Sequence, residues 1–235
     1  MIKFGQPHRH FFSCDSTNDA AKNWSLNAES PASSGALVTA DFQKQGRGQR
    51  GHCWQAETGQ SALMSLVYHL PPNTDAAQLG LVTALAIAEG LATLGVSPKI
   101  KWPNDLLLDG KKVGGILVEV ADKVAVLGIG INVSQTEFPG SEAFAYPPTS
   151  LRLAAGREQS VENVVEAVNE ALSLAEERWW REGFALIVER CRGRLAVGAT
   201  VRQGEVTAEL VGLADNGAAA VYLPDGTFTE WTTVG

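Results

Sequence analysis

The order of apolar and polar residues along the chain predicts a mixture of strands and helices. Short apolar runs that are typical of buried strands occur at 36–40, 62–68, 106–108, 113–120 and 124–131. Two longer segments carry apolar residues at near-helical spacing, one from Gln78 to Leu94 that Gly95 ends, and one that begins at Ser160. The polar run 15–19 predicts the start of another helix, because it offers an N-cap and an acidic first turn.

Turn signals indicate how these elements are connected. Asp109-Gly110 favours a type I′ hairpin between the runs at 106–108 and 113–120. Because hairpins join antiparallel neighbours, we expect an α/β (α+β) domain with a mixed or antiparallel sheet, and not a doubly wound one. Near the C-terminus short apolar runs alternate with glycine-containing turns, which predicts a small β-barrel packed on the first domain. We therefore divide the chain into residues 1–190 and 191–235.

Composition narrows the class of protein. The 235 residues are 45% hydrophobic, enough for a full core. The net charge of −7 argues against DNA binding, since phosphate contacts need clustered lysines and arginines. The three cysteines are far apart and odd in number, as expected in a reducing cytosol. We find neither an apolar signal core nor an apolar run of the roughly 18 residues that a membrane helix needs, and we expect a cytoplasmic protein without a membrane partner.

The glycine-rich segment 42–54 is the most informative part of the chain. Three of its glycines have the spacing of the dinucleotide pattern GxGxxG, but no amphipathic helix follows them, and no P-loop motif occurs. Successive glycines let backbone N–H groups converge on an anion, and Arg47 and Arg50 add guanidinium donors. An ordinary surface loop with two solvated arginines explains the same composition equally well.

Charged residues gather around the predicted hairpin. The segment 101–105, Lys-Trp-Pro-Asn-Asp, brings a lysine, an indole, an amide and a carboxylate into one turn, because Pro103 interrupts strand pairing. Lys112 stands beside Gly114-Gly115, and paired glycines within a strand indicate a bulge or a ligand close to the backbone. Lys111 is interpreted as a solvated surface lysine.

A third segment, 128–133, is an apolar strand with two glycines and Asn132 at its end. By itself this asparagine is typical of a residue that ends a strand in a turn.

Taken together and in this order, five segments resemble the biotin–protein ligase family: 15–18, 43–54, 101–106, 112–119 and 130–132. The resemblance is close over residues 10 to 135 and looser towards the C-terminus. It implies a biotin/lipoate ligase-like catalytic domain followed by a small SH3-like β-barrel. It also implies an enzyme that uses ATP and Mg²⁺ to convert biotin into biotinyl-5′-AMP. The biotin is then transferred to a lysine of a biotin carboxyl carrier protein, such as a subunit of acetyl-CoA carboxylase, by an enzyme that is often a homodimer.

The resemblance further implies roles for individual residues. Biotin would be bound by Ser16, Thr17, Asn18, Gln43, Gly46, Arg47, Gly48, Lys112 and Gly115. ATP would be bound by Arg47, Arg50, Trp54, Asn104, Lys112 and Asn132. The catalytic residues would be Arg47, Lys101, Asp105 and Lys112. The three cations would stabilise the negative charge that develops, and the Asp105 carboxylate would receive or orient the proton of the attacking amine.

One position departs from the family pattern. The family loop usually reads Gly-Arg-Gly-Arg, whereas residue 49 here is Gln. Because Gln lacks the guanidinium charge, we hypothesise that this enzyme holds its adenylate less tightly. No residue is assigned to stacking on the adenine.

Three other functions compete with this interpretation. A lipoate–protein ligase shares the adenylation logic, but the Lys-Trp-Pro-Asn-Asp and Gly-Arg-Gly segments favour biotin. A transcriptional repressor needs an N-terminal winged helix, for which the motif at residue 15 leaves no room, so we expect the monofunctional type without nucleic-acid binding. A non-catalytic biotin-binding or regulatory module is argued against by the presence of Arg47, Asp105 and Lys112.

Overall fold

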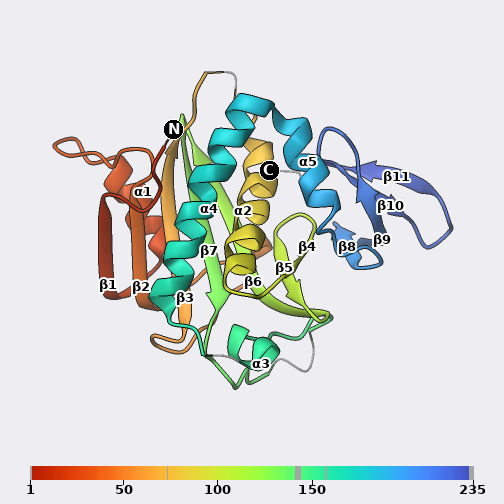
Figure 1. Ribbon diagram of the computed structural model, residues 1–235, viewed down its shortest axis with the longest axis horizontal. Helices are drawn as coiled ribbons and strands as arrows, with labels where there is room; N and C mark the ends of the chain where they lie inside the picture. The colour runs from red at the N-terminus through yellow and green to blue at the C-terminus, as the bar shows by residue number, and fades with distance from the viewer. Residues whose placement is uncertain (1, 73, 141–143, 157, 233–235) are drawn as a thin grey trace.

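The computed structural model describes residues 2–72, 74–140, 144–156 and 158–232, with Arg50 described by its backbone alone. It contains a seven-stranded sheet in the order β1-β2-β3-β7-β6-β5-β4 and a four-stranded sheet in the order β11-β10-β9-β8 (Figure 1). The strands of the large sheet are β1 (His8–Cys14), β2 (Leu37–Gln43), β3 (Ser61–His69), β4 (Lys99–Lys101), β5 (Asp105–Leu108), β6 (Lys111–Ala121) and β7 (Val124–Asn132). Those of the small sheet are β8 (Thr200–Gln203), β9 (Val206–Leu213), β10 (Ala219–Tyr222) and β11 (Phe228–Trp231). The helices are α1 (Thr17–Ser25), α2 (Leu79–Thr93), α3 (Leu151–Ala155), α4 (Val161–Glu182) and α5 (Phe184–Arg192), with short 3-10 turns η1 (Gln49–Gly51) and η2 (Ala76–Gln78).

The large sheet is mixed, as predicted. Only β1 and β2 pair in parallel, and the other neighbours pair antiparallel. Asp109 and Gly110, with φ of 48° and 74°, both adopt the left-handed conformation that a type I′ turn requires, which confirms the predicted hairpin between β5 and β6.

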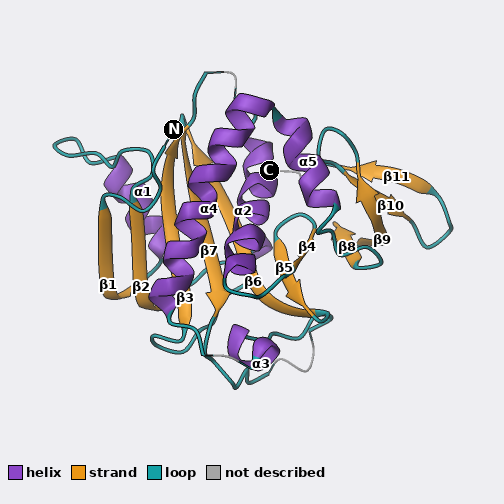
Figure 2. Ribbon diagram, in the orientation of Figure 1, coloured by secondary structure: helices purple, strands orange, loops and turns teal. Residues whose placement is uncertain are grey.

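Helices cover both faces of the large sheet. Figure 2 shows α2 and α4 side by side across one face, and the main hydrophobic core lies between them and the sheet. The helix α1 packs on the opposite face, where Trp24, Val38, Val67 and Val126 form a second, smaller core. Ser160 starts α4 as predicted, since its hydroxyl accepts a hydrogen bond from the Asn163 amide at 3.1 Å. The candidate site residues described below lie on the α1 face.

The sequence predicted only one apolar face for α2, but the helix is buried on most of its surface because α4 and α5 pack against it in addition to the sheet. One described segment, Ala76–Thr93, is by length and composition long and apolar enough to cross a membrane, with a mean hydropathy of 1.4. The expectation that no such segment exists was therefore wrong. In the structure 61% of that segment is buried inside the protein, and it forms the central helix of the core.

The small sheet shares the core of the large one. Leu210, Val221 and Trp231 belong to the same hydrophobic cluster as α2 and α4. The Trp102 indole N–H donates to the carbonyl of Gly217 at 3.2 Å, which joins the two sheets. The strands β8 and β11 form the two edges of the small sheet, so the closure of a barrel stays a prediction. The proposed boundary after residue 190 falls within α5 and also stays a prediction.

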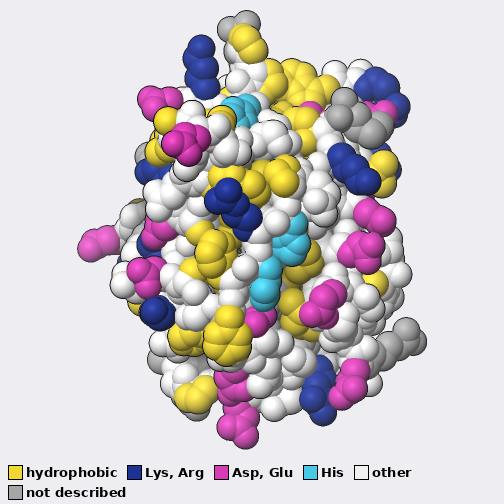
Figure 3. Space-filling view, turned by 90° about the vertical axis from the view of Figure 1, so that its left-hand side faces the viewer, with side chains coloured by type: hydrophobic (Ala, Val, Ile, Leu, Met, Phe, Trp, Pro, Cys, Tyr) yellow, Lys and Arg dark blue, Asp and Glu magenta, His cyan; other side chains and the backbone are white. Residues whose placement is uncertain are grey.

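The strand β1 was not predicted, because its sequence His-Arg-His-Phe-Phe-Ser-Cys lacks the apolar alternation of a buried strand. It forms one edge of the sheet, which Figure 3 views directly. The side chains of His8 and His10 approach Thr39 Oγ1 of β2 at 2.8 and 2.9 Å. Partial burial, with a smaller contribution from His10, lowers the pKa of His8. Polar contacts and exposed rings therefore replace core packing at this edge.

Candidate functional site

Glycines on the α1 face of the sheet make space for side chains to lie directly on the backbone. A Cβ on Gly130 would stand 2.6 Å from the Trp54 ring, and one on Gly115 would stand 3.2 Å from it. Gly115 and Gly130 are paired neighbours on β6 and β7. The indole of Trp54 therefore lies across Gly115 and Gly130, which we call the glycine floor, and a side chain on either would crowd the ring. The buried Nε1 of Trp54 has no hydrogen-bond partner among the described residues.

A cluster of two lysines and one carboxylate lies at one end of this floor. Asp105 Oδ1 is 2.5 Å from Lys112 Nζ, and Asp105 Oδ2 is 3.3 Å from Lys101 Nζ. The side chains of Lys101 and Asp105 are 14% and 15% exposed, so this cluster is largely withdrawn from water. Lys112 Nζ also lies 5.8 Å from the centre of the Trp54 ring. With two ammonium groups and one carboxylate, the cluster carries a net positive charge suited to an anion.

A β-bulge sets the direction of Lys112. The register between β5 and β6 shifts between Leu106 and Leu107, opposite the segment from Lys112 to Gly114. The extra residue re-aims the side chains around it. The backbone of Lys112 is fixed from the other side, since its N–H donates to Pro147 at 2.9 Å and its carbonyl accepts from Thr149 at 2.8 Å. The predicted bulge beside the glycine pair is thus confirmed.

A chain of polar side chains forms the other end of the floor. Gln43 Oε1 accepts from the Thr17 amide at 2.7 Å and from the Thr17 hydroxyl at 3.0 Å. The buried Ser65 hydroxyl lies 2.7 Å from Thr17 Oγ1 and 2.6 Å from Asn18 Oδ1. Asn18 Nδ2 in turn donates to Glu119 Oε2 at 2.6 Å. The structure therefore brings together Thr17, Asn18 and Gln43, three of the residues that the sequence had grouped.

Arg47 points to this polar end and not to the lysines. Its guanidinium binds Asp19 in a bidentate manner, at 2.6 and 2.7 Å, and reaches Glu119 at 3.2 Å. The hydrogen bonds from Arg47 are the largest influence on the pKa of Asp19 and lower it, so the ion pair persists through the neutral range and is lost only as the pH falls through that lowered value. The guanidinium of Arg47 thus fastens the glycine-rich loop to α1 and β6.

We predict that Asp19→Asn loosens this loop. An exposed ion pair contributes about 0.2–1 kcal/mol, so tryptic cleavage after Lys44 and Arg47 should become roughly 1.4- to fivefold faster in the folded protein. Limited proteolysis followed by mass spectrometry measures the rate. The matched control is Asp41→Asn, which removes a nearby half-buried carboxylate that lies 3.4 Å from His10 Nε2 and does not contact Arg47. Equal acceleration in the two variants would contradict the role of Asp19.

The loop itself forms a small hairpin-like turn. The Trp54 N–H donates to Gly46 at 2.9 Å, and the Gly48 N–H donates to His52 at 2.6 Å. A Cβ on Gly46 would stand 2.5 Å from the Trp54 carbonyl oxygen, so this close approach requires glycine. Gln49 begins the 3-10 turn at the tip. The Arg50 side chain, a predicted ATP ligand, lies outside the described residues.

Other predicted ligands have structural partners. Asn104 Nδ2 donates to the carbonyl of Ile116 at 3.0 Å, and Asn132 Nδ2 donates to the carbonyl of Thr149 at 2.9 Å. Ser16 is the N-cap residue of α1, but its side chain makes no capping hydrogen bond. Their roles in ligand binding stay predictions.

Sequence reasoning did not assign a site role to Asp19, Ser65, Glu119 and Tyr146. Ser65 carried a usable signal, because it is the one small polar residue within the apolar run 62–68. A buried hydroxyl in such a strand needs a partner. Asp19 and Glu119 carried no such signal, since their partner Arg47 is distant in sequence.

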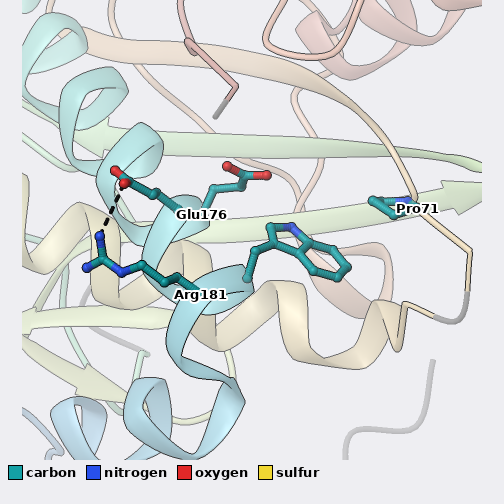
Figure 4. Close-up of a pocket in the computed structure, with 5 residues that line it drawn as sticks. Pro71, Glu176 and Arg181 are labelled. Atoms are coloured by element: carbon teal, nitrogen blue, oxygen red, sulfur yellow. Dashed lines mark hydrogen bonds and ion pairs between the residues drawn. The ribbon is translucent and has the colours of Figure 1, made fainter.

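A separate open hollow lies beside α4 and is lined by Pro71, Glu176, Glu177, Trp180 and Arg181 (Figure 4). Its charges are paired within the protein: Arg181 lies 3.3 Å from Glu177, and Glu176 accepts from the Ile2 amide at 3.4 Å. We therefore place the candidate site on the α1 face and not in this hollow.

Comparisons with known proteins agree with this geometry. A family model described as the biotin/lipoate A/B protein ligase family matches residues 11–135. A biotin–[acetyl-CoA-carboxylase] ligase of Paracoccus denitrificans is 33% identical over 226 residues, which cover 88% of this chain and 94% of that protein. The bifunctional ligase/repressor BirA of Bacillus spizizenii is 31% identical over 85% of this chain, and the chain spans 65% of its length. Against BirA of Bacillus subtilis the match covers 46% of that protein.

Solved structures extend the likeness over the whole described fold. Biotin protein ligase from Aquifex aeolicus in complex with biotin and ATP superposes with a TM-score of 0.84 at 27% identity, covering 97% of this chain and 96% of that one. A biotin acetyl coenzyme A carboxylase synthetase from Helicobacter pylori gives 0.65 at 25% identity, covering 95% and 98%. The family model covers more than half of the chain, and the Paracoccus relative matches nearly end to end. The chain therefore belongs to the biotin/lipoate A/B protein ligase family.

Proposed function

We propose that this protein is a biotin–protein ligase, which activates biotin with ATP to biotinyl-5′-AMP and transfers it to one lysine of a biotin carboxyl carrier protein. The observation that carries the proposal is the cluster of Lys101, Asp105 and Lys112 beside the glycine floor under Trp54. Membership of the family and the Aquifex neighbour, which holds biotin and ATP, support the same activity.

The first step joins two anions, so it needs positive charge. The carboxylate of biotin attacks the α-phosphorus of ATP, and pyrophosphate leaves. Negative charge builds on the phosphoryl oxygens as the carboxylate approaches. Lys112 and Lys101 are ammonium groups fixed in advance by Asp105, and preorganised donors of this kind stabilise such charge.

The polar chain at the other end of the floor would receive the ureido ring of biotin. The hydroxyl of Thr17 and the amides of Gln43 and Asn18 offer both donors and acceptors in a mostly buried setting. A buried polar pocket discriminates strongly, because a ligand without matching groups leaves it unsatisfied. Lipoate has no ureido group, so this end favours biotin over lipoate.

The second step transfers biotin to the carrier. The lysine amine of the carrier attacks the carbonyl of the adenylate, loses a proton, and AMP leaves. Both oxygens of Asp105 already accept from lysines, which suits an orienting role for this carboxylate. The glycine-rich loop, fastened by Arg47, would cover the mixed anhydride and exclude water.

Mg²⁺ would enter with the nucleotide. No group of three metal-ligating side chains occurs among the described residues, and the carboxylate of the cluster, Asp105, is engaged by two lysines. The residues present therefore do not form a magnesium site of their own, and we assign Mg²⁺ to the phosphates of ATP.

The proposal also covers the cellular location and the partners of the protein. We propose a cytoplasmic enzyme without a nucleic-acid or membrane partner, in agreement with the net charge of −7. A homodimer would form through a sheet edge, for which β1, with Phe12 74% exposed, is available. Analytical ultracentrifugation tests this association.

We predict that Gln49→Arg slows the release of biotinyl-5′-AMP. A guanidinium at the tip of the loop would add a charge-assisted hydrogen bond to the adenylate phosphate, worth about 1.5–3 kcal/mol, or roughly tenfold or more in dissociation rate. Rapid dilution of the preformed complex, followed by recovery of free adenylate, measures the rate. Equal rates for the two proteins would rule out the idea.

The proposed transfer is tested with a purified apo carrier domain. In the presence of ATP and biotin, intact-mass spectrometry should detect one biotinyl group, located on a single lysine by peptide mapping. Omission of ATP should abolish the product. If adenylate forms but no biotin is transferred, the adenylation step would be supported and the choice of carrier would be refuted.

A further inference from the structure

The segment from residue 144 to 150, between β7 and α3, lies beside the lysine–carboxylate cluster. Its backbone is held there, since Lys112 N–H donates to Pro147 and the Thr149 N–H donates to Lys112, at 2.9 and 2.8 Å. Tyr146 directly precedes the residues that make these hydrogen bonds. Its position relative to the cluster is therefore fixed by the backbone of Lys112.

The ring of Tyr146 faces Lys101. Lys101 Nζ lies 4.9 Å from the centre of the ring and 3.3 Å from Asp105 Oδ2. A lysine ammonium over an aromatic face is attracted by the ring, and the attraction grows as water is removed. Because the Lys101 side chain is only 14% exposed, both attractions act on a mostly desolvated ammonium.

The hydroxyl of Tyr146 reaches the small sheet. The Thr200 N–H, at the start of β8, donates to Tyr146 Oη at 2.6 Å. One side chain therefore contacts the lysine cluster through its ring and the C-terminal sheet through its hydroxyl.

We propose that Tyr146 is a positioning residue for the adenylation step: its ring holds the Lys101 ammonium, and its hydroxyl ties that arrangement to the C-terminal sheet. This inference rests on the proposed function of the site. Tyr146 would not touch the reacting atoms. It would restrict Lys101 to the place where the phosphoryl charge develops, mainly through its ring, and the hydrogen bond from Thr200 would add a smaller constraint on that ring.

Two substitutions separate the ring from the hydroxyl. Tyr146→Phe keeps the aromatic face but loses the bond to Thr200, whereas Tyr146→Leu loses both. In biotin-dependent ATP–pyrophosphate exchange we expect kcat to fall about tenfold for Tyr146→Leu and at most about twofold for Tyr146→Phe, with the KM for biotin unchanged in both. The control is Tyr222→Leu, which removes a half-exposed tyrosine of β10 that packs on Phe228, and it should leave kcat unchanged.

A double-mutant cycle tests whether Tyr146 acts through Lys101. Lys101→Met should lower kcat, and adding Tyr146→Leu to it should lower kcat no further, because the ring would no longer have an ammonium to hold. A purely structural role for Tyr146 would give multiplicative losses, which would overturn the proposal.

A measurement on the free protein separates this inference from the proposed function. With ¹³C-labelled lysine, the ε-CH₂ resonance of Lys101, assigned by its absence in Lys101→Arg, should be shifted by the ring current of Tyr146. The shift should persist in Tyr146→Phe and vanish in Tyr146→Leu. An unshifted resonance in the unmodified protein would overturn the proposal even if exchange is normal. If the Lys101 resonance shows the expected shift but biotin does not support exchange, the proposed function would be refuted. The contact between Lys101 and Tyr146 would still be established.

Discussion

Lys112→Ala is expected to abolish measurable adenylate formation while the protein remains folded. The substitution removes the ammonium 2.5 Å from Asp105, where the proposed mechanism requires positive charge for the phosphoryl oxygens. Loss of one preorganised donor of this kind lowers kcat by about 10²–10³-fold. Pyrophosphate exchange with saturating biotin and ATP measures the loss.

The fold of this variant should survive, because the hydrogen bonds that fix this position come from its backbone. Lys112 pairs with Pro147 and Thr149 through main-chain groups, and its side chain is 31% exposed. Thermal unfolding should therefore reveal a loss of only about 1 kcal/mol. Lys111→Ala is the matched control, since Lys111 is the exposed neighbour in the same strand. Near-normal exchange in Lys112→Ala, or an equal loss in Lys111→Ala, would contradict the role given to Lys112.

Gly130→Ala is expected to displace Trp54 and weaken biotin binding. The new methyl group would stand 2.6 Å from Trp54 Cε2, closer than such atoms approach, so the indole must move. Overpacking of this kind costs about 1–3 kcal/mol, which corresponds to roughly five- to 150-fold in affinity if the displaced ring occupies the ligand site. Isothermal titration calorimetry with biotin measures the affinity.

Rescue distinguishes this mechanism from general damage to β7. Trp54→Phe removes the indole atoms nearest to the new methyl group, so the double variant should recover part of the affinity that Gly130→Ala loses. Gly212→Ala is the control, because its methyl group would meet only Ala220 at an ordinary 3.7 Å. Unchanged affinity in Gly130→Ala would show that Trp54 does not define the site.

Local sequence signals predicted the parts of the site that local structure builds. Asp109-Gly110 determined the hairpin, and the hairpin register brings Asp105 opposite Gly115, beside Lys112. The paired glycines 114–115 indicated a bulge, and the register of β5 and β6 does shift beside them. In these places the sequence of a short segment determines its local backbone conformation.

The side-chain contacts that were not predicted join residues that are far apart in the sequence. Arg47 was expected beside the phosphate, but its partners in the structure are Asp19 on α1 and Glu119 on β6, 28 and 72 residues away. Many carboxylates along the chain would satisfy a guanidinium equally well, and only the packing of α1 on the sheet selects these two. The contact between Tyr146 and Thr200, 54 residues apart, depends in the same way on how the two sheets pack.

ATP–pyrophosphate exchange with biotin or lipoate as the acid is the decisive measurement for the proposed biotin–protein ligase activity. We expect exchange that depends on biotin and is not supported by lipoate, because the polar chain around Thr17 and Gln43 offers donors and acceptors for the proposed ureido ring. Exchange with lipoate alone, or no exchange with either acid in a protein that still binds biotin, would contradict the proposed activity.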